Sequence, residues 1–318
     1  MIPRVMPELP EVETIRKGLE KYLVGKKIVL IEIKLPRIVT GDIKKVINGK
    51  VISVIRSGKG LVINLNNGYS IAAHIKLTGQ FIYRSKETEG AKLSIKVGSQ
   101  LPNRWTHVIF KLDRGGVLYY NDLRQFGWIK IVKTDEVREL PFFKELGPEP
   151  PVVEKKRVLS QVFPRENPQG DPFSGVPLPA PPVDYVLTLE KFQEIVSKSP
   201  TKIKPLLMDQ KKIGGVGNIY ANDALWLAEI DPRRSAKSLS LSEQAKLYKA
   251  ILEVLKRGLK YSGASELNYV NTLGEEGEYQ KHFLAYAQNG KPCQKCRTRM
   301  QKIFLGGRGT YFCTSCQK

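Results

Sequence analysis

The amino-acid sequence predicts an α+β protein with more than one domain. Its 318 residues exceed the usual size of a single domain, so two domains could each bury a core. Residues 27 to about 133 form short runs rich in valine, isoleucine and tyrosine, whereas the runs after residue 185 repeat apolar side chains about every 3.6 residues. We therefore expect an N-terminal antiparallel β-sandwich, a C-terminal helical domain and a small cysteine-containing hairpin at the end.

One amphipathic helix should precede the strands. Over residues 10–23 apolar side chains recur at helical spacing, and acidic residues occupy the first turn, where the helix dipole favours them. Two segments between the strand-like runs have the composition of tight hairpin turns. They are Asn-Asn-Gly at 66–68 and Arg-Gly-Gly at 114–116. The strands should therefore pair mainly antiparallel, as in a sandwich or barrel.

A proline-rich stretch separates the strands from the helices. It lacks apolar periodicity, so we expect a linker or a surface excursion there. The helical period predicts the helices of the second domain over residues 187–198, 204–212, 218–229 and 241–261. The chain should divide into residues 1–148, 149–184, 185–282 and 283–318.

The balance of charge indicates a polyanionic partner. Lysine and arginine number 52 against 31 acidic residues, which gives a formal charge of +21 and a pI of about 9.7. Nucleic acid is the leading partner for such a chain. An acidic membrane surface is the alternative, but no run approaches spanning length and no basic amphipathic anchor stands out. The first residues lack the apolar core of a signal peptide, so we expect a reducing cytosol.

The last 26 residues contain all four cysteines, as two Cys-x2-Cys pairs separated by sixteen residues. This spacing is typical of a zinc ribbon, because each pair directs two thiolates at one ion. The intervening apolar residues alternate around two glycines, as a hairpin requires. The predicted ligands of one structural Zn2+ are Cys293, Cys296, Cys313 and Cys316. Their closed shell leaves no position for a catalytic water, and the alternative of two disulfides is disfavoured in a reducing compartment.

Several further motifs follow one another along the chain. They are MPELPEVET at 6–14, DLRQFG at 122–127, LGPEP at 146–150, GGVGNIYAND at 214–223 and GRGTYFCTSCQK at 307–318. In these motifs the chain resembles the bacterial formamidopyrimidine-DNA glycosylases, from about Met6 to Lys318. The resemblance implies a helix-two-turns-helix element in the helical domain. It also implies a glycosylase and apurinic/apyrimidinic lyase that removes oxidised purines, such as 8-oxoguanine and formamidopyrimidines, from double-stranded DNA in a bacterial cytosol.

The resemblance assigns the covalent chemistry to the first of these motifs. In this family the methionine is removed, and the exposed proline amine, here Pro7, attacks the sugar carbon that carries the damaged base. An α-amine has a pKa near 8, so it is partly neutral at physiological pH, can form an iminium, and then allows β,δ-elimination of the flanking phosphates. Because an internal proline has no amine, we expect translation to begin at Met6.

Four more side chains complete the catalytic set that the resemblance implies. Glu8 matches the carboxylate that shuttles protons to the sugar ring oxygen or the base, and Glu11 is a second acid near it. Lys59 matches a lysine that contacts phosphate and assists elimination, and Arg308 at the hairpin turn could reach a phosphate. Taken singly, Glu11 could merely help to start a helix, which would leave Pro7 and Glu8 unexplained, and the two cations could be solvated surface charges.

Six residues are expected to contact DNA. Enzymes that take a nucleotide out of the stack commonly fill the gap with apolar or planar side chains. By the resemblance, Leu77, Arg124 and Phe126 have this role; the alternatives are core packing for the apolar two and a surface ion pair for the arginine. The remaining three are His74, Lys204 and Asn218.

Residues 262–277 resemble the loop that covers the flipped base in this family, so we expect substrate choice to reside there. Two other functions remain open. An enzyme of the endonuclease VIII branch would act on oxidised pyrimidines, although the PELPEVE start differs from the glycine-containing start of that branch. A non-catalytic zinc-ribbon protein that binds damaged DNA is the alternative from another class. We expect a monomer.

Overall fold

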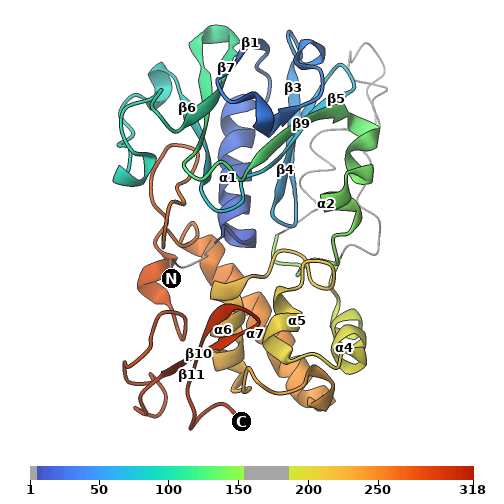
Figure 1. Cartoon of the computed structure of the whole chain (residues 1–318), viewed down its shortest axis with the longest axis vertical. Helices are drawn as coiled ribbons and strands as arrows, with labels where there is room; N and C mark the ends of the chain where they lie inside the picture. The colour runs from blue at the N-terminus through green and yellow to red at the C-terminus, as the bar shows by residue number, and fades with distance from the viewer. Residues whose placement is uncertain (1–5, 154–185) are drawn as a thin grey trace, which may run out of the picture.

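The computed structural model describes residues 6–153 and 186–318. It has a half built of strands and a half built of helices, with the small hairpin beside the helices (Figure 1). Among the described residues, no helix combines the length and the apolar character that crossing a lipid bilayer requires. Most of the predicted linker at 149–184 lies outside the described residues, and the three boundaries between the four predicted segments stay predictions.

Two sheets form the N-terminal half. Their strand orders are β1-β7-β8-β6 and β2-β9-β5-β4-β3. The strands are β1 (Ile28–Ile33), β2 (Val39–Thr40), β3 (Val51–Ser57), β4 (Gly60–Leu65), β5 (Tyr69–His74), β6 (Gly79–Arg84), β7 (Thr106–Leu112), β8 (Val117–Asp122) and β9 (Trp128–Lys133). Neighbours pair antiparallel except β2 and β9, which are parallel. The predicted antiparallel sandwich is confirmed, and both predicted turns join paired strands.

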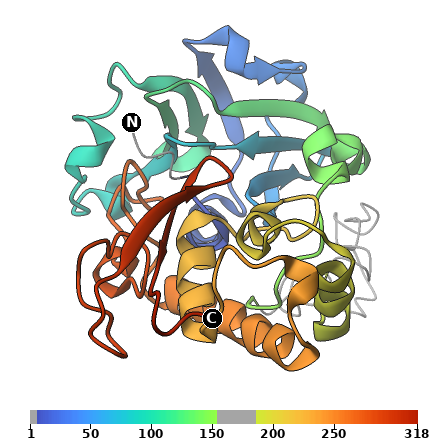
Figure 2. The same ribbon diagram turned by 60° about the horizontal axis from the view of Figure 1, so that its bottom comes forward.

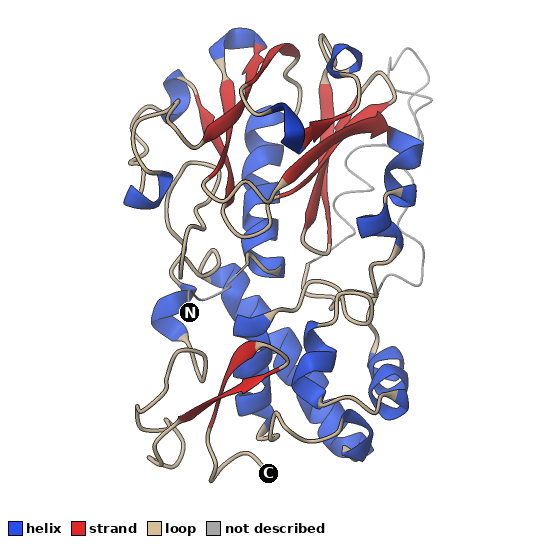
Figure 3. Cartoon of the chain, in the orientation of Figure 1, coloured by secondary structure: helices blue, strands red, loops and turns tan. Residues whose placement is uncertain are grey.

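Helix α1 (Leu9–Leu23) lies between the two sheets (Figure 3). Its buried residues from Val12 to Leu23 share one apolar core with both sheets. Leu9, one turn earlier, belongs instead to the core of the helical half. The first turn of α1 therefore lies at the boundary between the two halves, next to the segment that contains Pro7.

The helical half contains the four predicted helices. Within residues 186–318 they are α4 (Leu189–Lys198), α5 (Ile203–Met208), α6 (Asn218–Ala228) and α7 (Leu241–Lys260). Helix α5 ends before its predicted end because Asp209 is extended and its side chain accepts a hydrogen bond of 3.0 Å from the amide of Lys211. A short helix, α2 (Pro141–Lys144), closes the N-terminal half.

The terminal hairpin pairs β10 (Gln301–Leu305) with β11 (Arg308–Phe312), as the sequence predicts. It lies beside α6 with its turn directed toward the strand-built half (Figure 2). The amide of Tyr311 donates a 2.7 Å hydrogen bond to the side-chain oxygen of Asn222 in α6. The motif at 214–223 therefore supports the hairpin as well as beginning a helix.

Candidate active site and zinc centre

The carboxylate of Glu8 is buried at the boundary between the halves, with 2% of the residue exposed. Its oxygens accept hydrogen bonds of 2.8 Å from the amide of Ile219 and 3.4 Å from the amide of Tyr220. These amides belong to the first turn of α6, where N–H groups have no partner within the helix. Residue 217 must be glycine, because a Cβ there would lie 2.3 Å from the carboxyl carbon of Glu8. The acid beside Pro7 is therefore fixed by the second half of the chain.

The carboxylate of Glu11 is equally buried, and it connects three segments. One oxygen accepts a 2.8 Å hydrogen bond from the amide of Glu8. The other accepts bonds of 2.7 Å from the hydroxyl of Tyr220 and 2.7 Å from the amide of Ala264. Glu11 thus has a structural role, because it holds Glu8, α6 and the 262–277 loop together.

Lys59 brings a cation to the two acids. It follows Gly58, whose φ of +57° places the turn in the left-handed region that glycine tolerates. Only 4% of Lys59 is exposed, and its Nζ donates a 3.1 Å hydrogen bond to the main-chain oxygen of Val216. Burial lowers the pKa of Lys59, although the nearby charges of Glu8 and Glu11 act to raise it.

Burial raises the pKa of the two acids, whereas it lowers that of Lys59. It raises the pKa of Glu8 to about 7, even though Lys59 and the α6 amides lower it, and the charge of Glu11 adds to the rise. Burial also raises the pKa of Glu11. A carboxyl group with a pKa near neutrality can both donate and accept a proton at physiological pH. The site is therefore suited to acid and base chemistry.

Lys204 and Arg308 approach the same site from α5 and the hairpin. Lys204 has no exposed surface, and its Nζ donates bonds of 2.9 Å to the main-chain oxygen of Gly309 and 2.7 Å to the hydroxyl of Thr310. Burial lowers the pKa of Lys204 to about 7, while Glu8 raises it and Arg308 lowers it. Lys204 thus fastens the strand that carries the half-buried Arg308. Its contact with DNA stays a prediction.

Asn218 is the first residue of α6 and adjoins the amides that bind Glu8. Its main-chain oxygen accepts a 2.6 Å hydrogen bond from the side chain of Asn222. The structure thus brings Glu8, Glu11, Lys59, Lys204, Asn218 and Arg308 to one place. They come from positions up to 300 residues apart in the chain, from Glu8 to Arg308.

Arg124 and Phe126 lie elsewhere, on an exposed loop between β8 and β9. The guanidinium of Arg124 lies 5.0 Å from the centre of the Phe126 ring. Asp122 holds the loop by accepting hydrogen bonds of 3.2 Å from the amide of Arg124 and 2.7 Å from the amide of Gly127. Both side chains are free to meet a ligand, but their insertion into DNA stays a prediction.

Leu77 and His74 lie near the turn between β5 and β6. Leu77 is partly buried, whereas His74 is 3% exposed, packs edge-on against Phe142 with ring centres 4.6 Å apart, and accepts a 2.9 Å bond from the amide of Lys76. Burial lowers the pKa of His74 to about 3, and the charge of Lys76 adds to this, so the ring is neutral at pH 7. DNA contacts by both residues stay predictions.

An ion-pair network behind Lys59 was not expected from the sequence. Arg56 contacts Glu149 at 2.9 Å and Glu13 at 3.0 Å, and it donates a 2.7 Å hydrogen bond to the main-chain oxygen of Gly58. Glu149 also accepts a hydrogen bond from the amide of Gly58. Burial alone would lower the pKa of Arg56, but the two carboxylates raise it. One indication of this network was present in the sequence. Glu149 lies between two prolines in the LGPEP motif, and the resemblance assigned it no role in the site.

The 262–277 loop is fastened to the N-terminal half. Glu276 forms a 2.7 Å ion pair with Lys96 and accepts a 2.6 Å hydrogen bond from the hydroxyl of Ser94. Val270 packs with Ile82 and Val97 in a small apolar cluster. Together with the bond from Ala264 to Glu11, these contacts place the loop across both halves. Its role in substrate choice stays a prediction.

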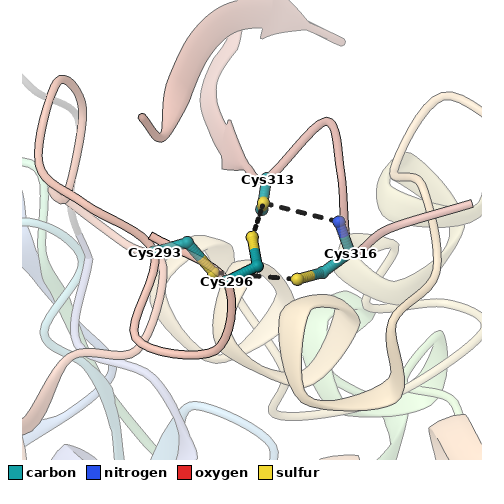
Figure 4. Close-up of side chains that lie close together, drawn as sticks. All are labelled: Cys293, Cys296, Cys313 and Cys316. Carbon is teal, nitrogen blue, oxygen red and sulfur yellow. Dashed lines mark hydrogen bonds between the residues drawn. The ribbon is translucent and has the colours of Figure 1, made fainter. Parts of the chain in front are cut away.

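The four cysteines come together at the base of the hairpin (Figure 4). Their sulfurs all lie within 4.8 Å of one another, with separations of 3.9 Å between Cys293 and Cys316 and 3.5 Å between Cys296 and Cys313. Four thiolates at about 2.3 Å from a tetrahedral zinc lie roughly 3.8 Å apart, whereas a disulfide requires about 2.05 Å. The cysteines are free and fit one structural zinc, and the disulfide alternative is wrong.

Loss of the metal should weaken DNA binding. In Cys296→Ser we expect zinc loss and at least about a tenfold lower affinity for a duplex with an uncleavable abasic site, since an arginine–phosphate bond contributes about 1.5–3 kcal/mol. Zinc analysis and fluorescence anisotropy would measure both effects. Ser315→Ala, one position from Cys316, is the control and should retain metal and affinity. Zinc-free protein that binds as tightly as the wild type would contradict the prediction.

The two-sheet half, the helical half and the four-cysteine hairpin, with buried acids and cations where they meet, form the architecture that the sequence resemblance implied. Sequence models of known domains agree. The formamidopyrimidine-DNA glycosylase N-terminal domain matches residues 6–129 and the H2TH domain of the same enzyme, its helix-two-turns-helix domain, matches 178–268. A zinc finger found in FPG and IleRS matches 290–318.

Whole-chain comparisons give the same result. The chain is 37% identical to the formamidopyrimidine-DNA glycosylase of Pelotomaculum thermopropionicum, covering 98% of this chain and 99% of that one, and 35% identical to that of Streptococcus mutans, covering 98% and 100%. A Lactococcus lactis enzyme bound to Fapy-dG-containing DNA has a TM-score of 0.78 at 29% identity, covering 98% and 100%. This chain belongs to the formamidopyrimidine-DNA glycosylase family.

Proposed function

We propose that this protein excises oxidised purines, including 8-oxoguanine and formamidopyrimidines, from duplex DNA and then cleaves the strand by β,δ-elimination. One observation carries the proposal. Glu8, next to Pro7 in the chain, is a buried acid with a pKa of about 7, and Lys59 is close enough to influence it. The name of the relatives and the Fapy-dG in the Lactococcus complex support the same substrate class.

In the first proposed step the amine of Pro7 attacks C1′ of the damaged nucleotide. A bond forms between the nitrogen and C1′, and the bond between C1′ and the base breaks with its electron pair leaving on the base. The base, or the sugar ring oxygen as the ring opens, then needs a proton. Glu8 in its protonated form supplies that proton, which its pKa near neutrality permits.

The attacking amine then loses its proton to water, and the bond between C1′ and the ring oxygen breaks, which leaves an iminium at Pro7. In the second step this iminium acts as an electron sink. Water takes a proton from C2′, the bond between C3′ and its phosphate oxygen breaks, and a second elimination breaks the bond between C5′ and its phosphate oxygen. Each phosphate leaves with the electron pair of its broken bond. We assign the binding of these phosphates to Lys59 and Arg308: Glu8 raises the pKa of Lys59, and the charge of Arg308 lowers it.

Excision of oxidised pyrimidines is a second candidate. It is favoured by one observation, a Lactococcus lactis relative bound to DNA that contains an oxidised pyrimidine, with a TM-score of 0.77 at 30% identity. The two candidates differ in the base that is removed and share the chemistry of the sugar. A direct comparison of substrates therefore separates them.

The test uses matched duplexes with 8-oxoguanine or an oxidised pyrimidine, each incubated with the protein and borohydride. We expect faster excision of 8-oxoguanine, cleavage on both sides of the lesion, and a trapped adduct that mass spectrometry maps to Pro7. Faster excision of the pyrimidine would favour the second candidate. Tight binding to both duplexes without excision or an adduct would refute the catalytic proposal.

A further inference from the structure

Phe304 on β10 is an exposed aromatic residue outside the site described above. It is 62% exposed, and Phe126 is the other exposed aromatic side chain among residues 6–153 and 186–318. One lies on each half of the protein, and each has a cation over its ring. The sequence resemblance assigns Phe126 to the gap left by the flipped nucleotide but gives Phe304 no role.

The pairing of the hairpin explains why Phe304 stays uncovered. Its partner across the strands is Gly309, which has no side chain to pack over the ring. On the same face, the Nζ of Lys302 lies 5.6 Å from the Phe304 ring and 5.5 Å from the Tyr311 ring. Tyr311 in turn packs against Tyr286, with ring centres 5.2 Å apart. The side chains of Tyr286, Tyr311, Lys302 and Phe304 therefore contact one another in a row that leads from the core to the solvent.

The charged side chains of the hairpin that carries Phe304 are all positive. Residues 297–312 contain no aspartate or glutamate, and their cations are Arg297, Arg299, Lys302 and Arg308. Arg308 is on the opposite face of the ribbon, because it pairs with Leu305 next to the turn. A two-stranded ribbon can enter a DNA groove, which has a phosphate backbone on each side. An exposed ring amid cations is also the usual arrangement for stacking on nucleic acid.

We propose that Phe304 stacks on a base or sugar of the duplex beside the lesion, as an aromatic contact made from the zinc hairpin. This inference rests on the proposed function, because it takes damaged duplex DNA as the occupant. Arg308 binds phosphate from one face of the ribbon, Phe304 stacks from the other, and Lys302 neutralises a phosphate near the ring. Phe126 serves as the corresponding aromatic contact from the N-terminal half.

The test measures affinity for a duplex with an uncleavable abasic site over a series of salt concentrations. Phe304→Ala should weaken binding about tenfold with an unchanged salt slope, because stacking is lost but no charge is removed. Phe304→Tyr should bind like the wild type, and Phe304→Leu should bind like the alanine variant. Lys302→Ala should reduce the salt slope by about 0.9. Leu241→Ala, an exposed apolar residue at the start of α7, is the control and should change nothing.

Zinc content, measured for every variant, confirms that the hairpin is intact. Phe304→Ala with full zinc and an affinity within twofold of the wild type would overturn the inference, and so would a leucine variant that binds like the wild type. Excision of 8-oxoguanine by the wild type is measured in parallel. A wild type that binds through Phe304 but excises nothing would refute the proposed function and leave the stacking contact standing.

Discussion

Replacing Glu8 by glutamine is expected to slow base excision by a factor on the order of 10³, since positioned proton transfer contributes about 10²–10⁴. Glutamine is nearly isosteric, and its one side-chain oxygen can still accept the 2.8 Å hydrogen bond from the amide of Ile219, although the longer bond from Tyr220 is lost, so the packing of α1 against α6 should persist. It has no acidic proton to transfer. In the wild type, excision should pass through a maximum near neutral pH, because the protonated form of Glu8 is lost as the pH rises above about 7 and the neutral form of an α-amine with a pKa near 8 is lost as the pH falls.

The thermal stability of Glu8→Gln shows whether a loss of activity comes from a loss of folding. The pKa of Glu8 in the folded protein, about 7, lies above its ordinary value of 4.5, so the folded state retains a proton that the unfolded state releases. The free energy of unfolding therefore falls as the pH rises from about 4.5 to 7, and the loss persists above that window. Glu8→Gln escapes this loss and should melt at or above the wild-type temperature at pH 8. A variant that keeps a tenth of the wild-type rate would contradict the role of Glu8.

A chain that retains residues 1–6 is expected to form no borohydride-trapped adduct, whereas a chain that begins at Pro7 should form one. With a residue before it, the Pro7 nitrogen is an amide without a free electron pair for attack, so an iminium cannot form. The match to the N-terminal family domain begins at Met6, which agrees with a reactive chain that starts at the next residue. Mass spectrometry of both proteins after trapping on an abasic duplex makes the comparison.

The two chains share every other residue of the site, so their affinities for an uncleavable abasic duplex serve as the control. Similar affinity with an adduct in the shorter chain alone would isolate the amine as the cause. An adduct in the longer chain that maps to Lys59 or another lysine would contradict the assignment to Pro7.

The parts of this structure that depend on local sequence could be predicted. The helix before the strands, the hairpin turns and the α6 and α7 segments follow from periodicity and turn composition, and the cysteine spacing predicts the metal site. The resemblance nominated the site residues, and the structure places six of them together. The parallel pairing of β2 with β9 carries no such local signal, because it depends on how distant strands align.

Contacts between distant segments were also missed. Nothing near Glu8 indicates that its carboxylate would bind amides more than 200 residues later, and the motif around Glu149 does not indicate that its partner is the turn that precedes Lys59. Burial changed the picture of two expected DNA contacts. The resemblance identified Lys204 and His74 as residues that contact DNA, but both side chains are buried. Their burial depends on segments that are distant in the sequence, so the local motifs could not show it.

Helix α1 contributes to two hydrophobic cores, with Leu9 in one and the residues from Val12 onward in the other. The two halves are therefore not independent cooperative units, since melting either core would expose part of the same helix. Calorimetry would then record one endotherm whose van't Hoff and calorimetric enthalpies agree. Slow hydrogen exchange in the first turn of α1 would report global unfolding, so the segment carrying Glu8, the proposed catalytic acid, would be among the last parts to open.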